Sequence, residues 1–224
     1  MGGALAKPWL FIAATAAFVV FAFTVLPAKA ADAALYTPPG ASFDTSLFYT
    51  PAEAIERAVS YGEEGRSAYI FDRWTFDLVF PLIYGLFMLS AWAFSLKRLA
   101  PGGAITDRVR AGAEKSGEAK PGYRWLLVPA LGIAFDFAEN SAVTLLMLGV
   151  GSLGAEAAPA GGILGGAMGE PSWLGLAAFA SSAATALKWL FVGAGFAGAL
   201  ILPLAAGLGA LLRRRRAGRQ AAGQ

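Results

Sequence analysis

The sequence predicts an all-α membrane protein, a bundle of four transmembrane helices with a short amphipathic helix outside the membrane. Mean hydropathy is +0.57 and 57% of the 224 residues are hydrophobic, which exceeds the usual composition of soluble domains. Four apolar runs are long enough to cross a hydrocarbon core of about 30 Å. Segments rich in Lys and Arg also alternate along the chain with acidic segments, as in multipass membrane proteins.

We expect one integral membrane domain, residues 1–224, divided as follows. Spans are expected at residues 8–27, 74–96, 125–150 and 180–212, outer loops at 28–73 and 151–179, a cytoplasmic loop at 97–124, and a basic tail at 213–224.

The composition removes several classes of chemistry. The chain contains no cysteine, which excludes disulfides, thiolate metal sites and thiol nucleophiles. It also contains no histidine, the commonest general base and the usual ligand of zinc, haem and copper. We therefore expect no metal and no cofactor. The net charge of +3 comes from basic residues beside apolar spans, so we expect no nucleic-acid partner.

The first apolar run, Pro8 to Leu26, carries no charge. A cleaved signal peptide is one interpretation, because Ala28-Lys29-Ala30 matches an A-x-A cleavage site. The apolar run is about 18 residues long, whereas the apolar core of a signal peptide spans about 7 to 15. A retained transmembrane helix is therefore favoured.

The segment after the first span contains one clear helix start. Ala31 to Thr50 is rich in Pro, Gly and Ser and is expected to be an ordered or semi-ordered loop. Thr50 can act as N-cap, Pro51 occupies the first helical position, and Glu53 completes a capping box. These residues predict an amphipathic helix over Pro51 to Tyr61, outside the membrane.

The second span is expected after a bend that Gly62 and Gly65 permit. Polar and special residues recur here at steps of three or four, which places them on one helical stripe away from lipid. They are Arg66, Tyr69, Arg73, Asp77, Pro81 and Tyr84. Arg73 stands four residues before Asp77 and is expected to pair with it. Pro81 has no N–H, so the Asp77 carbonyl lacks its usual hydrogen-bond donor within the helix. The free carbonyl is either part of a polar site or the result of an ordinary proline kink.

The third span has two carboxylates in its middle. Asp136, Glu139 and Asn140 stand at i, i+3 and i+4 and share one helical face. Asp136 lies about 16 Å and Glu139 about 21 Å along the helix from Trp125. A charge near the bilayer centre costs at least about 2.5 kcal/mol, so these side chains are expected to face the bundle interior.

The last apolar region, Trp173 to Leu212, is too long for one perpendicular crossing. Either its first part projects beyond the membrane or Pro203 kinks a tilted helix. Lys188 is the only cation embedded in it. Gly193, Gly195 and Gly198 match G-x-G-x-x-G, but within an apolar helix close packing explains them better than a dinucleotide site does.

Charge placement predicts the orientation. The basic segments are Lys7, the loop at 97–124 and the tail, so both termini are expected in the cytoplasm. The tail begins with Arg213, Arg214, Arg215 and Arg216. This cluster is expected to anchor the last span or to contact anionic lipid head groups.

The intramembrane charges are expected to converge in the outer half of the bundle, because the Lys188 stem can reach the carboxylates. The predicted polar cluster comprises Asp77, Asp136, Glu139, Asn140, Lys188, Arg73, Tyr84, Arg66 and Tyr69. Charged groups in a buried cavity are candidates for a functional site. The alternative is that the ions only pair helices and fix their register.

Four motifs resemble a family of bacterial four-span integral membrane proteins with no known activity. They are YGEEGRSAY at Tyr61 to Tyr69, DLVFPLIYG at Asp77 to Gly85, DFAEN at Asp136 to Asn140, and the solitary Lys188. The resemblance covers Pro51 to about Leu200. It implies a place in the bacterial inner membrane and transfers no activity.

Three functions are compatible with these features. The polar cluster could bind a small polar ligand, an ion or a lipid head group. The protein could instead be an accessory subunit that pairs with another membrane protein. An enzyme acting on lipid or peptide would use Glu139 or Asp136 as general base and Lys188 as electrostatic stabiliser, although the sequence has no nucleophile signature. The lipid bilayer is an expected partner in all three.

Overall fold

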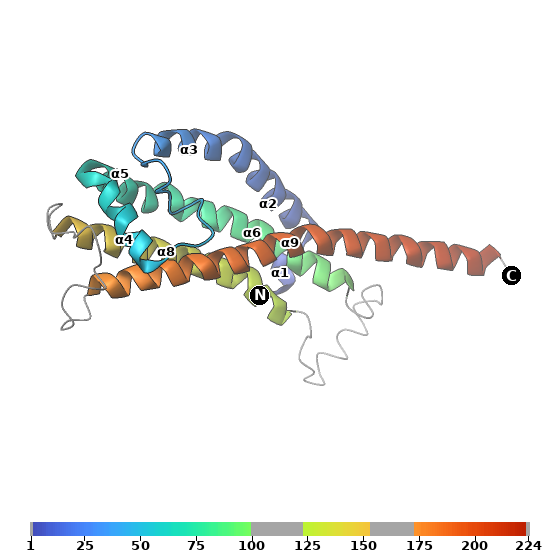
Figure 1. Cartoon of the computed structure of the whole chain (residues 1–224). Coiled ribbons are helices and arrows are strands. Elements are labelled where there is room, and N and C mark those ends of the chain that lie inside the picture. Colours follow the sequence, from blue (N-terminus) through green and yellow to red (C-terminus); the bar gives the residue numbers. More distant parts are fainter. Residues whose placement is uncertain (1, 100–122, 153–172, 223–224) are drawn as a thin grey trace.

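The computed structural model describes residues 2–99, 123–152 and 173–222, and within them the regular elements are all helical (Figure 1). The predicted fold class is confirmed, since four helical segments are long and apolar enough to cross a membrane. They are Pro8–Ala34, Gly62–Leu99, Arg124–Ser152 and Trp173–Leu212.

The first of these segments has three parts. After the short helix α1 (Gly2–Leu5), α2 (Pro8–Val20) continues through a π-helical turn, η1 (Phe21–Val25), into α3 (Leu26–Ala34). A π-helical turn is a recognised cause of a change in helix direction, and α3 arches over α5 and α6 (Figure 1). The loop expected from Ala31 is wrong for its first four residues, because the alanine-rich stretch has high helix propensity.

The capping box forms as predicted and begins α4 (Pro51–Ser60). The Glu53 amide donates to Thr50 Oγ1 at 3.2 Å, and the Thr50 amide donates to Glu53 Oε2 at 2.6 Å. Gly62, at φ +65°, makes the predicted bend before α5 (Gly62–Arg73). Gly65 lies within α5 and allows close packing, since a Cβ there would approach the Tyr36 carbonyl oxygen to 3.1 Å.

The second long segment consists of two helices, although sequence periodicity predicted one continuous polar stripe from Arg66 to Tyr84. α5 ends at Arg73, and α6 (Phe76–Leu99) begins after Trp74 and Thr75, with Pro81 buried inside it. The segment therefore extends twelve residues before the predicted start at residue 74. The sequence placed Arg66, Tyr69 and Arg73 on a helical stripe but ahead of the span, and α5 packs into the core at the α4 end of the bundle.

The remaining helices form the longest pair. A 3-10 turn, η2 (Tyr123–Leu126), leads into α8 (Leu127–Ser152), which packs along α9 (Trp173–Ala222). α9 begins seven residues before the predicted residue 180 and continues through Pro203. At about 1.5 Å per residue its 50 residues span about 75 Å, and its C-terminal part projects past the other helices (Figure 1).

Two hydrophobic cores occupy opposite ends of the bundle. The core at the α4 end joins the loop before α4 with α4, α5, α8 and the start of α9; it includes Phe43, Tyr49, Ile55, Leu146 and Leu174. The first turns of α9 therefore pack here; whether they project beyond the membrane stays a prediction. The second core joins α2, α6 and α9; it includes Phe87, Met88, Trp92 and Val192.

Glycines in α9 allow close helix packing, as the sequence analysis expected. The Trp92 indole donates its Nε1–H to the Gly195 carbonyl oxygen at 2.8 Å. The same ring fills the space that a Cβ at Gly198 would occupy. Gly193 has open space instead. Two of the three motif glycines thus have a packing role.

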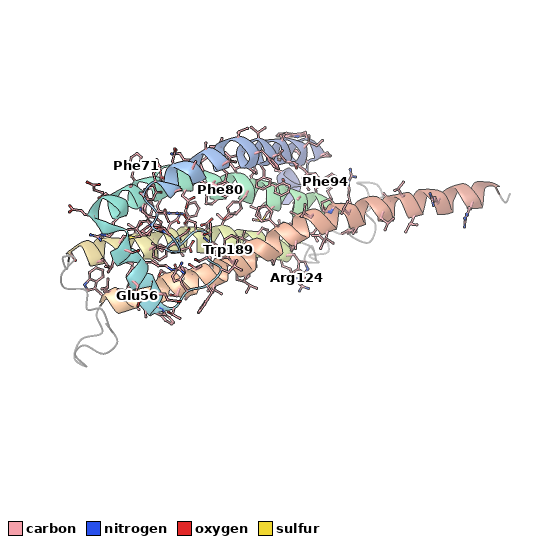
Figure 2. All side chains as sticks on the ribbon, turned by 45° about the horizontal axis from the view of Figure 1, so that its top comes forward. Glu56, Phe71, Phe80, Phe94, Arg124 and Trp189 are labelled. Atoms are coloured by element: carbon pink, nitrogen blue, oxygen red, sulfur yellow. The ribbon has the colours of Figure 1, made fainter. Side chains whose placement is uncertain are left out.

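The outward surfaces of the long helices are apolar. Leu82, Leu145, Leu200 and Leu204 each expose more than half of their surface. Contiguous apolar surface of this kind is unfavourable in water and suited to lipid. Figure 2 places Glu56 and Phe71 at one end of the bundle, Phe80 and Trp189 in the middle, and Phe94 and Arg124 at the other end.

Candidate functional site

The predicted charge cluster comes together between the two cores. Lys188 Nζ, on α9, forms an ion pair with Glu139 and lies 3.9 Å from Asp136 Oδ1, both on α8. The exposed fractions are 7% for Lys188, 1% for Glu139 and 8% for Asp136. The spacing of three residues between the two carboxylates places both on the face of α8 that meets α9.

Each carboxylate of this cluster has a second partner. The Tyr84 hydroxyl, on α6, donates to Asp136 Oδ2 at 2.5 Å. The Thr185 hydroxyl donates to Glu139 and also hydrogen bonds with the Tyr49 hydroxyl at 2.8 Å. Burial raises the pKa of Tyr49, which keeps its hydroxyl protonated at neutral pH. The cluster thus joins α6, α8, α9 and the loop before α4.

A second group of charges surrounds Arg73. Its guanidinium pairs with Asp77, as the i, i+4 spacing predicted, and also with Asp44 from the loop before α4. It lies over the ring of Tyr69, 4.4 Å from the ring centroid. Asp44 was not predicted, because it lies in a segment without helical periodicity, although its neighbour Phe43 is buried.

A third group, also missed by the sequence analysis, ties α3 to α5. Lys29 Nζ lies 3.6 Å from Asp72 Oδ1, and the Tyr36 hydroxyl donates to Asp72 Oδ2 at 2.8 Å. Burial and the neighbouring Asp72 carboxylate raise the pKa of Tyr36, so its hydroxyl stays a donor. This group holds the end of the first span beside the rest of the bundle.

Three predicted site residues lie away from the ion pairs of Lys188. Arg66 is buried near Gly151, with its Nε 3.6 Å from the position of a Cβ there. Tyr69 packs by its ring edge against Phe43 and beneath Arg73. Asn140 is 2% exposed, and its side-chain nitrogen and oxygen have no hydrogen-bond partner within the described residues. Arg66 and Tyr69 precede the break between α5 and α6 at Trp74 and Thr75, which explains why the residues of the predicted stripe do not all meet at one site.

A cavity of about 610 Å³ lies between α3, α6, α8, α9 and the loop that contains Asp44. Part of the lining is charged or polar; it includes Lys29, Asp44, Asp72, Arg73, Asp77, Tyr84, Asp136 and Lys188. Another part of the lining is apolar; it includes Leu26, Ala30, Ala33, Phe76, Phe80, Val192 and Phe196. The volume lies within the usual range for small-molecule sites, about 300 to 1,000 Å³.

The arrangement separates residues in contact with the cavity from residues behind it. Asp77, Asp136, Lys188, Arg73 and Tyr84 line the cavity. Glu139 does not line it and instead holds Lys188 from behind, through the ion pair between α8 and α9. The arginine cluster expected to contact lipid head groups lies far from this cavity, in the projecting part of α9. That contact stays a prediction.

Comparison with protein-family models, with curated proteins and with solved structures finds no match. The family resemblance of the four sequence motifs therefore stays an expectation.

Proposed function

We propose that the protein is an integral membrane protein whose cavity binds a small amphipathic molecule through its polar group. The cavity of about 610 Å³, lined by both charged and apolar side chains, carries this proposal. A ligand with a polar head and an apolar chain can contact both kinds of side chain at once. Water or an ion alone would leave the apolar wall of α3 unused.

Packing considerations support a binding role over a purely structural one. Buried ion pairs are weak stabilisers compared with apolar side chains of similar volume. Here Asp77, Asp136 and Lys188 border a cavity, where fewer atoms surround them than in a packed core. Ionisable residues in a membrane interior commonly mark binding sites or transport paths.

The first span supplies a route for an amphipathic molecule. Pro27, Ala28 and Ala31 of α3 are exposed, so this helix is covered by little protein on its other side. Leu26, Lys29, Ala30 and Ala33 of α3 form one wall of the cavity. A single helix therefore separates the cavity from the surrounding lipid, and the ligand can enter beside α3.

Native mass spectrometry of the protein in gentle detergent tests the proposal. The wild type should retain a bound small molecule, and Asp77→Leu with Asp136→Leu should lose it, because both carboxylates line the cavity and would no longer meet the polar group. This double variant should still fold, since Arg73 keeps Asp44 and Lys188 keeps Glu139 as a partner. Trp92→Phe is the matched control, since Trp92 is buried outside the cavity and should leave binding unchanged. A double variant that folds and keeps the molecule would contradict the proposal.

We also propose that both termini face the cytoplasm of a bacterial cell, with α4 and α5 on the outer side of the inner membrane. The exposed residue Glu64 of α5 and the exposed residue Arg219 of the tail give a direct test. In intact cells with a permeabilised outer membrane, an impermeant thiol reagent should label Glu64→Cys and spare Arg219→Cys. The reverse labelling pattern would overturn this orientation.

A role as accessory subunit is the second candidate. Gly193, Ala194 and Ala197 are exposed on α9, and small exposed residues allow another membrane helix to approach closely. A protein of defined mass that co-purifies in the same experiment would favour this role. The enzyme interpretation has less support, because Glu139 lies behind the cavity and Asp136 is already engaged with Tyr84 and Lys188.

A further inference from the structure

We propose that the ligand of this cavity carries an organic cation, a protonated or quaternary amine attached to an apolar chain. This inference rests on the proposed function above and specifies the chemical class of the ligand. Charge balance, the aromatic lining and the apolar wall of α3 support it independently.

The charged groups at the cavity include more carboxylates than cations. Two cations, Arg73 and Lys188, meet the carboxylates of Asp44, Asp77, Asp136 and Glu139. Each cation thus already has two acidic neighbours, and neither is left to neutralise an anionic head group. At the α3 side, Lys29 and Asp72 balance each other.

This excess of negative charge sets the sign of the ligand. Unbalanced charge in a low-dielectric interior is unfavourable, and an added cation reduces it. An anionic group such as a phosphate or carboxylate would increase the repulsion. The field inside the cavity therefore favours a positively charged group beside Asp77 and Asp136, which both line it.

Aromatic rings in the lining add a second preference for organic cations. Two of the protein's own ammonium groups already lie over rings that line the cavity. Lys29 Nζ is 5.7 Å from the centroid of Phe76, and Lys188 Nζ is 5.3 Å from Trp189. Ring faces attract ammonium groups through their electron-rich surface and offer nothing comparable to an anion.

The wall formed by α3 accounts for the apolar chain of the ligand. Ala30, Ala33 and Ala34 lie at i, i+3 and i+4, so they share one face of α3, and all three line the cavity. Their small side chains leave room along the helix that a hydrocarbon chain can fill. Phe80 and Phe196 face the same space from α6 and α9.

Three probes with alkyl chains of seven or eight carbons test the charge of the head group: octyltrimethylammonium, octanoate and octanol. Binding is measured on the purified full-length protein in dodecyl maltoside, from tryptophan fluorescence and from the shift in Tm. Octyltrimethylammonium should bind about tenfold tighter than octanoate, with octanol between them. Trp189 lines the cavity and reports occupancy.

Variants assign the preference to the carboxylates. Asp136→Asn should weaken binding of octyltrimethylammonium about tenfold, because a charged partner is replaced by a neutral one of the same shape. If this variant does not fold, Asp77→Asn takes its place. Ser95→Ala is the control, since Ser95 is buried on α6 outside the cavity and its hydroxyl donates to the Ala91 carbonyl oxygen of the same helix. This variant should bind like wild type.

The outcomes separate this inference from the proposed function. Octanoate binding as tightly as octyltrimethylammonium, or an equal loss of binding in Ser95→Ala and Asp136→Asn, would overturn the amine class. The class would also be wrong if the wild type retained a bound molecule in native mass spectrometry while none of the probes bound. Absence of both probe binding and a retained molecule would refute the proposed function itself.

Discussion

Replacement of Arg73 should destabilise the protein more than replacement of either of its carboxylate partners. Arg73 is 6% exposed and pairs with both Asp44 and Asp77. Its loss in Arg73→Gln leaves two carboxylates facing each other without a cation. Removal of one partner from a buried ion pair typically costs about 3–5 kcal/mol.

The two carboxylates should differ because their burial differs. The Asp77 side chain is 16% exposed, so Asp77→Asn should cost about 1.5–3 kcal/mol, the usual range for a hydrogen bond to a charged group. The Asp44 side chain is 39% exposed, and Asp44→Asn should cost about 1 kcal/mol or less, as for a pair screened by solvent.

Thermal unfolding in detergent, followed by intrinsic fluorescence, measures these differences. For a chain of this length about 1 kcal/mol corresponds to about 2–4 °C, so Arg73→Gln should lower Tm by about 6–20 °C. The triple variant Asp44→Asn, Arg73→Gln and Asp77→Asn should recover about half of that loss, because no uncompensated charge remains. Lys97→Gln, at an exposed end of α6, is the control and should change stability by about 0.5 kcal/mol or less.

Two results would refute this account of Arg73. Strictly additive effects in the triple variant would mean that the three side chains do not act as one charged group. Equal destabilisation by Arg73→Gln and Asp77→Asn would mean that Asp44 does not serve as a second partner.

Three further predictions concern other parts of the fold. Gly198→Leu should lower Tm by several degrees, because the side chain would collide with the Trp92 indole. Thr50→Ala should destabilise α4 by about 0.5–2 kcal/mol, measured by hydrogen exchange at pH 7. Hydrogen bonds from Thr50 lower the pKa of Glu53. The contribution of Glu53 to stability is therefore present above its ordinary pKa and lost as pH falls through the lowered pKa. Burial raises the pKa of Tyr61 to about 12. The protonated hydroxyl therefore contributes to stability below its ordinary pKa of 10.0, and this contribution is lost as pH rises towards 12. When Tm is measured at increasing alkaline pH, Tyr61→Phe should lose less stability than wild type over this range.

Local sequence patterns determined the helices, the side chains that share a face of one helix, and the capping residues that begin α4. Apolar runs predicted four long helices, and the capping residues predicted the first residue of α4. The spacings of Arg73 with Asp77 and of Asp136 with Glu139 predicted which side chains share a face. These features depend on residues a few positions apart, whose relation helix geometry fixes.

The ends of the helices were less predictable than their existence. Hydropathy cannot distinguish a residue that faces lipid from an equally apolar residue in a protein core. The predicted span began at residue 180, whereas α9 begins at Trp173, and its residues Leu174 and Ala178 belong to the core at the α4 end.

Only the tertiary structure decided which distant residues complete the site. Asp44 reaches Arg73 from a loop without periodicity, and Tyr49 reaches Thr185 across 136 positions of sequence. Conversely, Arg66 shares a sequence stripe with Tyr84, but the break between α5 and α6 separates their surroundings. Periodicity fixes the direction of a side chain on its own helix, whereas its partner depends on how the chain between them folds. The cavity likewise depends on tertiary structure, because its lining comes from α3, α6, α8, α9 and the loop that contains Asp44.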